Sequence, residues 1–333
     1  MAIVETATGP IDSADLGETL IHEHLVARDE AVMLQFPQMG TVREGPVKAV
    51  THVEAEDVAD EAAEDAVERG VKTICDPTAL FLGRDVGLMK RVSERTGLQV
   101  VPCTGIYTYD HLPTALVSRD ADAIAALYVH DIEQGIQGTD IKAAFIKCAA
   151  DEPGITENVE KLHRAAARAS VQTGAPIMAH SRPASDTAPR QIEIFLEEGV
   201  SPEKIQIAHC GDSPDADYVE SILATGVYAG LDRFGIEMYL PYEQRMEVAE
   251  ALLERGHAER LFLSADSCAT IDWFDATTVE QLADGGMVKD WTIKIVHDRV
   301  LPDLREGGMT DEQERTMMVA NAARWLTGEE LTD

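Results

Sequence analysis

The sequence is poor in positive charge and in cysteine. Its 333 residues carry 28 Lys and Arg against 60 Asp and Glu, a formal net charge of −32 with neutral histidines. Nucleic acids and anionic membrane surfaces are bound through clustered basic side chains, so this balance argues against both partners. The cysteines have no CxxC pair, which argues against a disulfide framework or zinc ribbon and favours reduced thiols. They are Cys75, Cys103, Cys148, Cys210 and Cys268.

Several other signals are absent from the sequence. No apolar run approaches the roughly 18 residues of a membrane span. The first seven residues, Met-Ala-Ile-Val-Glu-Thr-Ala, lack the basic start and apolar stretch of a signal peptide. With the reduced thiols, this leads us to expect a cytoplasmic protein. No phosphate-binding GxxxxGK[ST] or GxGxxG loop and no GxSxG nucleophile elbow are present.

What the sequence does have is an alternation of short apolar runs and amphipathic helical stretches. Two such stretches span residues 53–70 and 155–174, and Gly70, Gly97 and Gly174 mark expected helix ends. Strand–helix alternation predicts a parallel sheet with right-handed crossovers. The runs number eight and end near His24, Asp76, Thr104, Lys147, His180, His209, Asp232 and Asp266.

Eight such units predict an α/β protein that closes into a (β/α)8 TIM barrel. An open doubly wound sheet built from the same units is the alternative. We expect one domain over residues 1–333, with the barrel proper at about 19–327. The segment before Thr19 is expected to form a short cap or hairpin, and residues 310–326 the last helix.

The strongest local signal is the tripeptide His22-Glu23-His24. In a strand, side chains two residues apart point to the same face, so both imidazoles would point together, into the barrel if Leu20 also faces inward. Two histidines on one strand can bind the same divalent ion. The plain alternative is a buried pair that bonds to the backbone.

Other metal-compatible residues stand at the ends of predicted strands. His180 and His209 end the fifth and sixth runs, and Asp266 ends the eighth. In a barrel these ends converge on the face where active sites are built. Imidazole and carboxylate ligands together suit zinc, cobalt, iron or manganese, so the sequence predicts a metal site there.

Lys147 ends the fourth run in an unusually apolar setting. If it faces the barrel interior near cations, desolvation and like charge both lower its pKa. A neutral amine can add carbon dioxide to form a carbamate, an anionic group able to bridge two metals. The alternative is a lysine whose ammonium reaches solvent.

The remaining strand ends are less diagnostic. Asp232 and Asp76 each either orient a ligand or cap a turn. Tyr107 and Tyr109, after the third run, either reach over the site or pack on its rim.

Taken in order, the HxH pair and the strand-end Lys, His, His and Asp resemble the amidohydrolase superfamily, and within it the phosphotriesterase-like lactonases. The resemblance runs from about Gly9 to about Leu326. The matching stretches are 19–25, 105–109, 147–154, 208–213, 230–235 and 266–268.

This resemblance implies a binuclear metal centre at the carboxyl ends of the strands, with zinc favoured. His22, His24 and Asp266 would hold the more buried ion, and His180 and His209 the more exposed one. Carboxylated Lys147 and a hydroxide would bridge the two ions.

The resemblance also implies a function. The family's lactonases open N-acyl-homoserine lactones, a quorum-quenching activity, hydrolyse organophosphates weakly and are usually homodimers. Tyr107 and Arg233 match the family's active-site tyrosine and its seventh-strand arginine. In the expected mechanism the hydroxide attacks the lactone carbonyl, Tyr107 hydrogen-bonds the carbonyl oxygen, and Asp266 carries the proton to the leaving alkoxide. The acyl tail would lie along an apolar groove from the loops after the seventh and eighth strands, for which Tyr239, Cys268, Ile271 and Trp273 are the candidates; the alternative is that these residues simply pack within the loops.

The sequence departs from the family after His180, where Ser181 and Arg182 replace a frequent Thr and His. Ala265 replaces a common His, and Ala322 follows Asn321 in place of Pro. None of these changes removes an expected metal ligand. The rival functions are a phosphotriesterase acting mainly on organophosphates, a deaminase or cyclic-amide hydrolase on the same barrel, and a non-catalytic barrel kept as a binding protein.

Overall fold

The computed structural model describes residues 2–29, 32, 35–36, 40–43, 48–50 and 54–328. Eight parallel strands form the central sheet, in the spatial order β3-β7-β8-β9-β10-β11-β12-β13, which is also their order along the chain. They are β3 (Thr19–Leu20), β7 (Thr73–Asp76), β8 (Gln99–Gly105), β9 (Phe145–Ala149), β10 (Ile177–His180), β11 (Ile205–Ala208), β12 (Tyr228–Leu231) and β13 (Leu261–Leu263). This sheet curls into a nearly closed (β/α)8 barrel, which confirms the predicted fold.

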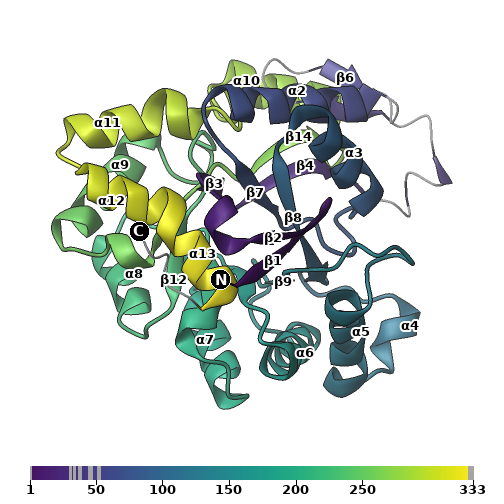
Figure 1. Cartoon of the computed structure of the whole chain (residues 1–333). Coiled ribbons are helices and arrows are strands. Elements are labelled where there is room, and N and C mark those ends of the chain that lie inside the picture. Colours follow the sequence, from purple (N-terminus) through teal and green to yellow (C-terminus); the bar gives the residue numbers. More distant parts are fainter. Residues whose placement is uncertain are drawn as a thin grey trace.

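Helices run between successive strands and cover the outside of the barrel, as Figure 1 shows. They are α2 (Glu54–Glu68), α3 (Val86–Thr96), α4 (Thr114–Val117), α5 (Ala121–Glu133), α6 (Glu157–Thr173), α7 (Thr187–Glu197), α8 (Ala216–Leu223), α9 (Tyr242–Glu254) and α10 (Ala276–Asp284). The chain continues through α11 (Leu301–Glu306), α12 (Asp311–Arg315) and α13 (Asn321–Thr327). Two π-helical turns, Val296–Val300 and Thr316–Ala320, precede α11 and α13, so the predicted last helix over 310–326 is helical but irregular.

The barrel closes at a seam between its first and last strands. Across the described chain no ladder joins β3 directly to β13. Instead, β3 continues after a bend at residues 21–22 into β4 (Glu23–Ala27), and the chain beyond β13 continues into β14 (Ser267–Ile271). These extensions pair in parallel, with Glu23 opposite Ser267. Two short strands, β5 (Thr41–Arg43) and β6 (Lys48–Val50), add to the outer edge of β14.

Apolar side chains pack in two layers, one outside the barrel strands and one inside them. The larger layer lies between the strands and the surrounding helices. The smaller layer fills the interior from alternate strand positions, and at one end it meets Val4, Leu16 and Trp325. Figure 1 shows the hairpin of β1 (Ile3–Thr6) and β2 (Gly9–Asp12) and helix α13 lying across this end. The hairpin predicted before Thr19 is therefore present, and it helps to close the amino-terminal end of the barrel.

Local signals explain where the helices begin and end. The Thr156 side chain accepts a hydrogen bond from the Val159 amide at the start of α6, and Gly174 ends that helix with φ 78°. Gly97 ends α3 in the same left-handed conformation, at φ 81°. Such a backbone favours glycine because it has no Cβ.

Most predicted strand ends are correct to within two residues, including His209 and Asp232, which directly follow β11 and β12. The exceptions fall at the seam, where Asp266 lies three residues beyond β13. The expected single strand through the HxH motif is wrong, because the bend at 21–22 divides it into β3 and β4.

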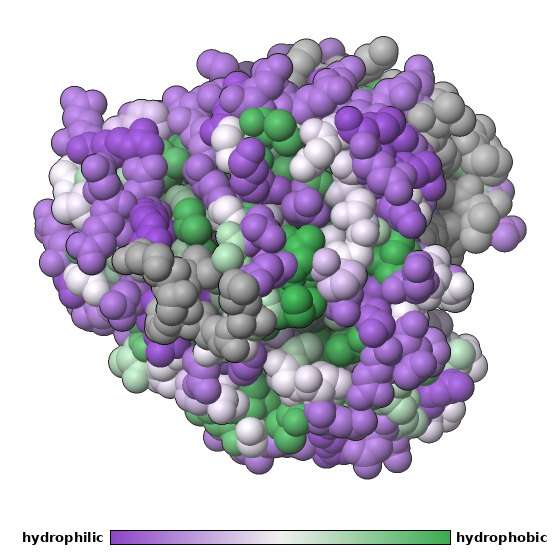
Figure 2. Space-filling view, in the orientation of Figure 1, coloured by the Kyte–Doolittle hydropathy of each residue, from purple (hydrophilic) through white to green (hydrophobic). Residues whose placement is uncertain are grey.

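None of the helices in the described ranges combines the length and apolar character that a bilayer crossing requires. On the face that Figure 2 shows, hydrophilic residues predominate and apolar ones form small separate groups. This distribution fits the excess of acidic residues.

One buried histidine makes the stability of the helical layer pH-dependent. His163 of α6 is fully buried, its Nδ1 lies 2.7 Å from the Val159 carbonyl oxygen, and its Nε2 lies 2.9 Å from Gln191 Nε2. The neutral ring satisfies both contacts by donating from Nδ1 and accepting at Nε2. Burial lowers the pKa of His163 to about 4 from 6.5, so the unfolded chain takes up a proton at higher pH than the folded one.

We therefore expect His163 to contribute stability above pH 6.5 that is lost as the pH falls toward 4. Between pH 7 and pH 5 the loss from this group is about 2 kcal/mol. Denaturant unfolding of wild type and His163→Leu at both pH values measures it. The substitution of exposed His130 by Asn is the control and should leave the pH dependence unchanged. A wild-type slope retained in His163→Leu would contradict this assignment.

Candidate metal centre

All the metal ligands that the sequence suggested meet at the carboxyl end of the barrel. The structure brings together side chains from the first, fourth, fifth, sixth and eighth strand–loop units, all of them buried or largely buried. They are His22, His24, Lys147, His180, His209 and Asp266.

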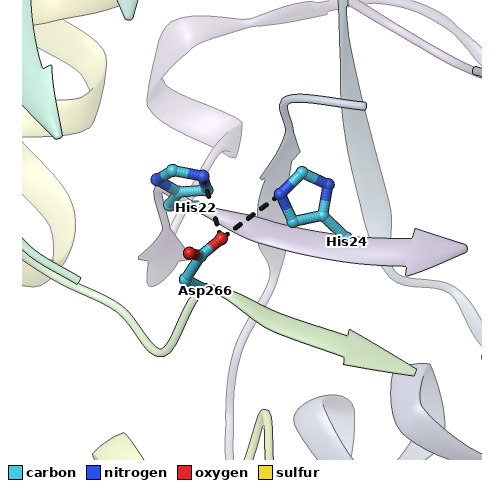
Figure 3. A group of neighbouring side chains, drawn as sticks. All are labelled: His22, His24 and Asp266. Carbon is cyan, nitrogen blue, oxygen red and sulfur yellow. Dashed lines mark ion pairs between the residues drawn. The ribbon is translucent and has the colours of Figure 1, made fainter. Parts of the chain in front are cut away.

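His22, His24 and Asp266 form one group, shown in Figure 3. The Nε2 atoms of His22 and His24 lie 3.1 and 3.3 Å from Asp266 Oδ1. We expected both imidazoles to point inward if Leu20 also did. Leu20 instead packs in the outer apolar layer, and Ile21 faces the interior. The bend after β3 changes the alternation, and this change turns both imidazoles toward the site.

His180 and His209 form the second part of the cluster. His180 Nδ1 lies 3.0 Å from His209 Nε2. Regular alternation would turn His209 away, since Ala208 already faces the interior. His209 instead has φ 66°, and this left-handed conformation returns its side chain to the site at a backbone cost of about 1–2 kcal/mol.

Asp232 connects the two parts. Its Oδ2 lies 3.0 Å from His22 Nδ1, and its Oδ1 lies 3.0 Å from His209 Nδ1. Oδ1 also accepts a hydrogen bond from the His209 amide, at 2.8 Å. The carboxylate thus accepts a hydrogen bond from Nδ1 of both rings and fixes the direction in which each Nε2 points. Of the two roles left open for Asp232, the structure shows the orienting one.

Other polar side chains fix the remaining two imidazoles. Thr78 Oγ1 lies 2.7 Å from His24 Nδ1, and Asp151 Oδ2 lies 2.6 Å from His180 Nε2. Asp151 also pairs with Arg182, one of the residues that departs from the family pattern, at 3.0 Å. Asp76 acts on the backbone instead, where it accepts hydrogen bonds from the amides of Leu25 and Thr78.

Lys147 points into the interior from β9 and is 1% exposed, so it does not reach solvent. Its Nζ lies 3.1 Å from His22 Nε2 and 3.4 Å from Met178 Sδ. Burial lowers the pKa of Lys147 to about 8. Gly105, with φ 122°, lies beside it, and a Cβ there would stand 1.9 Å from the Lys147 carbonyl oxygen. Only glycine permits this close approach of β8 to β9.

The protonation of these groups suits a cation. Burial lowers the pKa of His180 to about 4 and that of His209 well below its ordinary value, so both rings are neutral near pH 7. Burial and the Lys147 ammonium lower the pKa of His22, but Asp266 and Asp232 outweigh both and raise it. The carboxylates therefore favour positive charge at the position where His22 Nε2 points.

The spacing of the ligand atoms also suits a cation. Two ligands bound tetrahedrally to zinc at 2.0–2.1 Å stand about 3.3 Å apart. The His22–Asp266, His24–Asp266 and His180–His209 atom pairs lie 3.1, 3.3 and 3.0 Å apart. The residues present therefore fit divalent metal ions.

Tyr107 and Arg233 stand over this cluster. Tyr107 Oη lies 3.2 Å from His180 Nδ1 and 3.0 Å from Tyr109 Oη. Burial raises the pKa of Tyr107 well above its ordinary value, so the phenol keeps its proton. Arg233 Nε donates to Asp266 Oδ2 and its Nη1 to Asp212 Oδ2, both at 2.9 Å.

An apolar pocket opens beside the polar cluster. About 760 Å³ of space, counted out to its open mouth, lies between the histidines and a wall of apolar side chains. Tyr239, Cys268, Ile271 and Trp273, the residues expected to bind substrate, all line it. Tyr239 and Trp273 stand at the mouth, 50% and 41% exposed, and Arg233 stacks on the Tyr239 ring at 4.5 Å.

Sequence reasoning missed Thr78, Asp151 and Asp212 as partners of the site. Each lies within a few residues of a predicted strand end, which was the available signal. Loop residues have no periodicity, so the sequence does not show which of them turns inward.

A barrel with a buried histidine–carboxylate cluster at the carboxyl ends of its strands is typical of metal-dependent hydrolases. A family model described as the phosphotriesterase family matches residues 2–326. The chain is 40% identical over 317 residues to an aryldialkylphosphatase of Saccharolobus solfataricus, which covers 95% of this chain and 97% of the relative. It is 39% identical over 335 residues to a phosphotriesterase homology protein of Mycobacterium tuberculosis, with 97% of each chain covered.

A solved structure of the phosphotriesterase from Mycobacterium tuberculosis superimposes with a TM-score of 0.89. It has 37% identity, with 98% of each chain covered. The chain therefore belongs to the phosphotriesterase family, within the amidohydrolase superfamily, and is an ester-bond hydrolase of that family.

The double contact of Asp232 generates a prediction. Asp232→Asn keeps the size of the side chain but can accept a hydrogen bond from only one of the two Nδ1–H groups. We expect its metal affinity to fall about 10–100-fold. Elemental analysis after dialysis against graded chelator measures the loss. Exposed Asp140→Asn is the matched control, and equal metal retention in both variants would contradict the orienting role.

Proposed function

We propose that the protein is a metal-dependent lactonase whose preferred substrates are N-acyl-homoserine lactones, so that it acts in quorum quenching. One observation carries this proposal. The polar cluster that can act on an ester carbonyl lies at the floor of an apolar pocket, with the neutral phenol of Tyr107 beside it. An N-acyl-homoserine lactone has a small polar ring, which matches the polar cluster, and an apolar tail, which matches the pocket.

We assign the metals to the family's pattern. His22, His24 and Asp266 would hold one divalent ion, His180 and His209 the other, and carboxylated Lys147 would bridge them. Zinc suits this ligand set, with cobalt, iron and manganese as alternatives. When bound, such ions supply Lewis-acid polarisation and a nucleophile at the hydroxide level near neutral pH.

The chain's own residues then divide the remaining work. Tyr107 donates a hydrogen bond to the carbonyl oxygen as negative charge develops there. Asp266 accepts the proton of the attacking nucleophile and returns it to the leaving alkoxide. Arg233 holds Asp266 Oδ2 at 2.9 Å and so directs Oδ1 toward the two histidines.

The pocket wall supports the acyl-tail assignment. Ile271 and Cys268 lie in an apolar cluster beside the metal centre, and Trp273 stands 5.7 Å from the Tyr107 ring, centroid to centroid. A neutral substrate also fits a chain with net charge −32, whose overall field repels anions.

The main rival is a phosphotriesterase that acts chiefly on organophosphates, a reading that the name aryldialkylphosphatase of one relative keeps open. The same cluster can deliver a nucleophile to phosphorus. What favours the lactone is the depth of apolar wall, which a compact phosphotriester would leave partly unfilled.

A substrate panel separates the two activities. The protein should be stripped of metal, reconstituted with zinc or with cobalt, and assayed on homoserine lactones of increasing tail length and on paraoxon. Each methylene buried by the wall contributes about 0.8 kcal/mol. The kcat/KM should therefore rise up to about 4-fold per methylene until the pocket is filled, and should exceed that for paraoxon. Preference for paraoxon, or full activity of metal-free protein, would overturn the proposal.

The proton role of Asp266 is tested by Asp266→Asn, which has nearly the same shape. We expect kcat to fall by about 10²-fold or more, with a melting curve close to that of wild type in the metal-free form. Asp140→Asn serves again as the surface control. Turnover near that of wild type would exclude Asp266 from the chemistry.

The homodimer implied by the family resemblance and the cytoplasmic location inferred from the cysteines and the N-terminal residues stay predictions. Light scattering of the purified protein measures the first, and fractionation of the source cells the second.

A further inference from the structure

The middle residue of the His22-Glu23-His24 motif has no role in the mechanism above. Glu23 begins β4, and its side chain points away from the two imidazoles, as alternation along a strand requires. It is fully buried. A carboxylate removed from water at this position needs compensation from several donors.

Glu23 receives four hydrogen bonds, two on each oxygen. Oε1 accepts from Ser264 Oγ and from the Ala265 amide, both at 2.7 Å. Oε2 accepts from the Ser267 amide at 2.9 Å and from Ser267 Oγ at 2.5 Å. All four donors belong to Ser264, Ala265 and Ser267, which lie within two residues of Asp266 on either side, so the carboxylate binds the backbone segment that carries Asp266.

The bracketed segment has an unfavourable backbone. Asp266 has φ 51°, a left-handed conformation that non-glycine residues adopt only when the surroundings impose it. Its amide donates to the His22 carbonyl oxygen at 3.1 Å, and the His22 amide donates to Ser264 Oγ at 3.0 Å. The Ser264 hydroxyl therefore links the Glu23 carboxylate to the backbone of His22.

We propose that Glu23 is a positioning residue that holds Asp266 against His22 and His24 through its bonds to Ser264, Ala265 and Ser267. This proposal rests on the proposed function, in which His22, His24 and Asp266 hold one metal ion. Among the described residues, the hydrogen bonds of the Glu23 side chain all go to the segment around Asp266, so we assign Glu23 neither to the metal ligands nor to the substrate pocket. Without the Glu23 carboxylate, residues 264–267 would relax, and Asp266 would move away from the ion that it shares with His22 and His24.

The test uses Glu23→Gln, whose amide nitrogen cannot accept the bonds that one carboxylate oxygen accepts. The metal-free protein is titrated with zinc alone and with cobalt alone against a chelator of known affinity. We expect one of two bound ions to bind about 10-fold or more weakly, with a changed visible spectrum of the cobalt form. A merely structural role would lower the melting temperature and leave affinity and spectrum as in wild type, which would overturn the proposal.

Ser267→Ala provides a second variant in case Glu23→Gln fails to fold. It removes one donor hydroxyl and keeps the carboxylate, and we expect a weakening of about 3-fold or more of the same ion. Ser170→Ala is the matched control, since Ser170 is an equally buried serine whose hydroxyl donates to the Ala175 carbonyl oxygen in the outer layer. Wild-type affinity in Ser267→Ala would count against Glu23 as the holder of Asp266.

The wild-type titration distinguishes the two proposals. Wild-type protein that binds neither zinc nor cobalt would overturn the metal-dependent function itself. Wild-type protein that binds two ions, together with an unaffected Glu23→Gln variant, would overturn only the role of Glu23.

Discussion

The site depends on one carboxylate shared by two imidazoles. Asp232 accepts hydrogen bonds from Nδ1 of His22 and of His209, one on each of its oxygens. These histidines come from the first and sixth strand–loop units, so a single side chain orients one imidazole in each half of the cluster. Because the group is fully buried, water does not compete for either hydrogen bond.

The sequence predicts the architecture well because a parallel barrel repeats one simple pattern. Each apolar run is bounded by polar residues and followed by a helix with recognisable ends, such as α6 between Thr156 and Gly174. The same repetition brings every strand end to one face, so Lys147, His180 and Asp266 could be grouped before their positions were known. An open sheet would have left the first and last of these units far apart.

The details that the sequence does not predict are those set by tertiary contacts. Strict alternation would place both His22 and His209 on the wrong side, and a bend before one and a left-handed residue at the other correct this. Neither feature has a local signature, since neither position holds glycine. The partners of the imidazoles, such as Thr78 and Asp151, lie in loops where only the folded chain decides which side chain turns inward. Backbone strain at these positions is paid for by the surrounding packing.

The seam of the barrel brings the candidate ligands of one metal ion together from two edges of the sheet. His22 and His24 belong to one edge of the seam and Asp266 to the other, and in the described chain no direct ladder joins β3 to β13. An ion bound among them cross-links the two edges. Since unfolded chain cannot offer this arrangement, occupancy stabilises the closed barrel by mass action. With such an ion bound, the melting temperature would rise with free metal concentration, and chelation would loosen the enzyme at its point of closure.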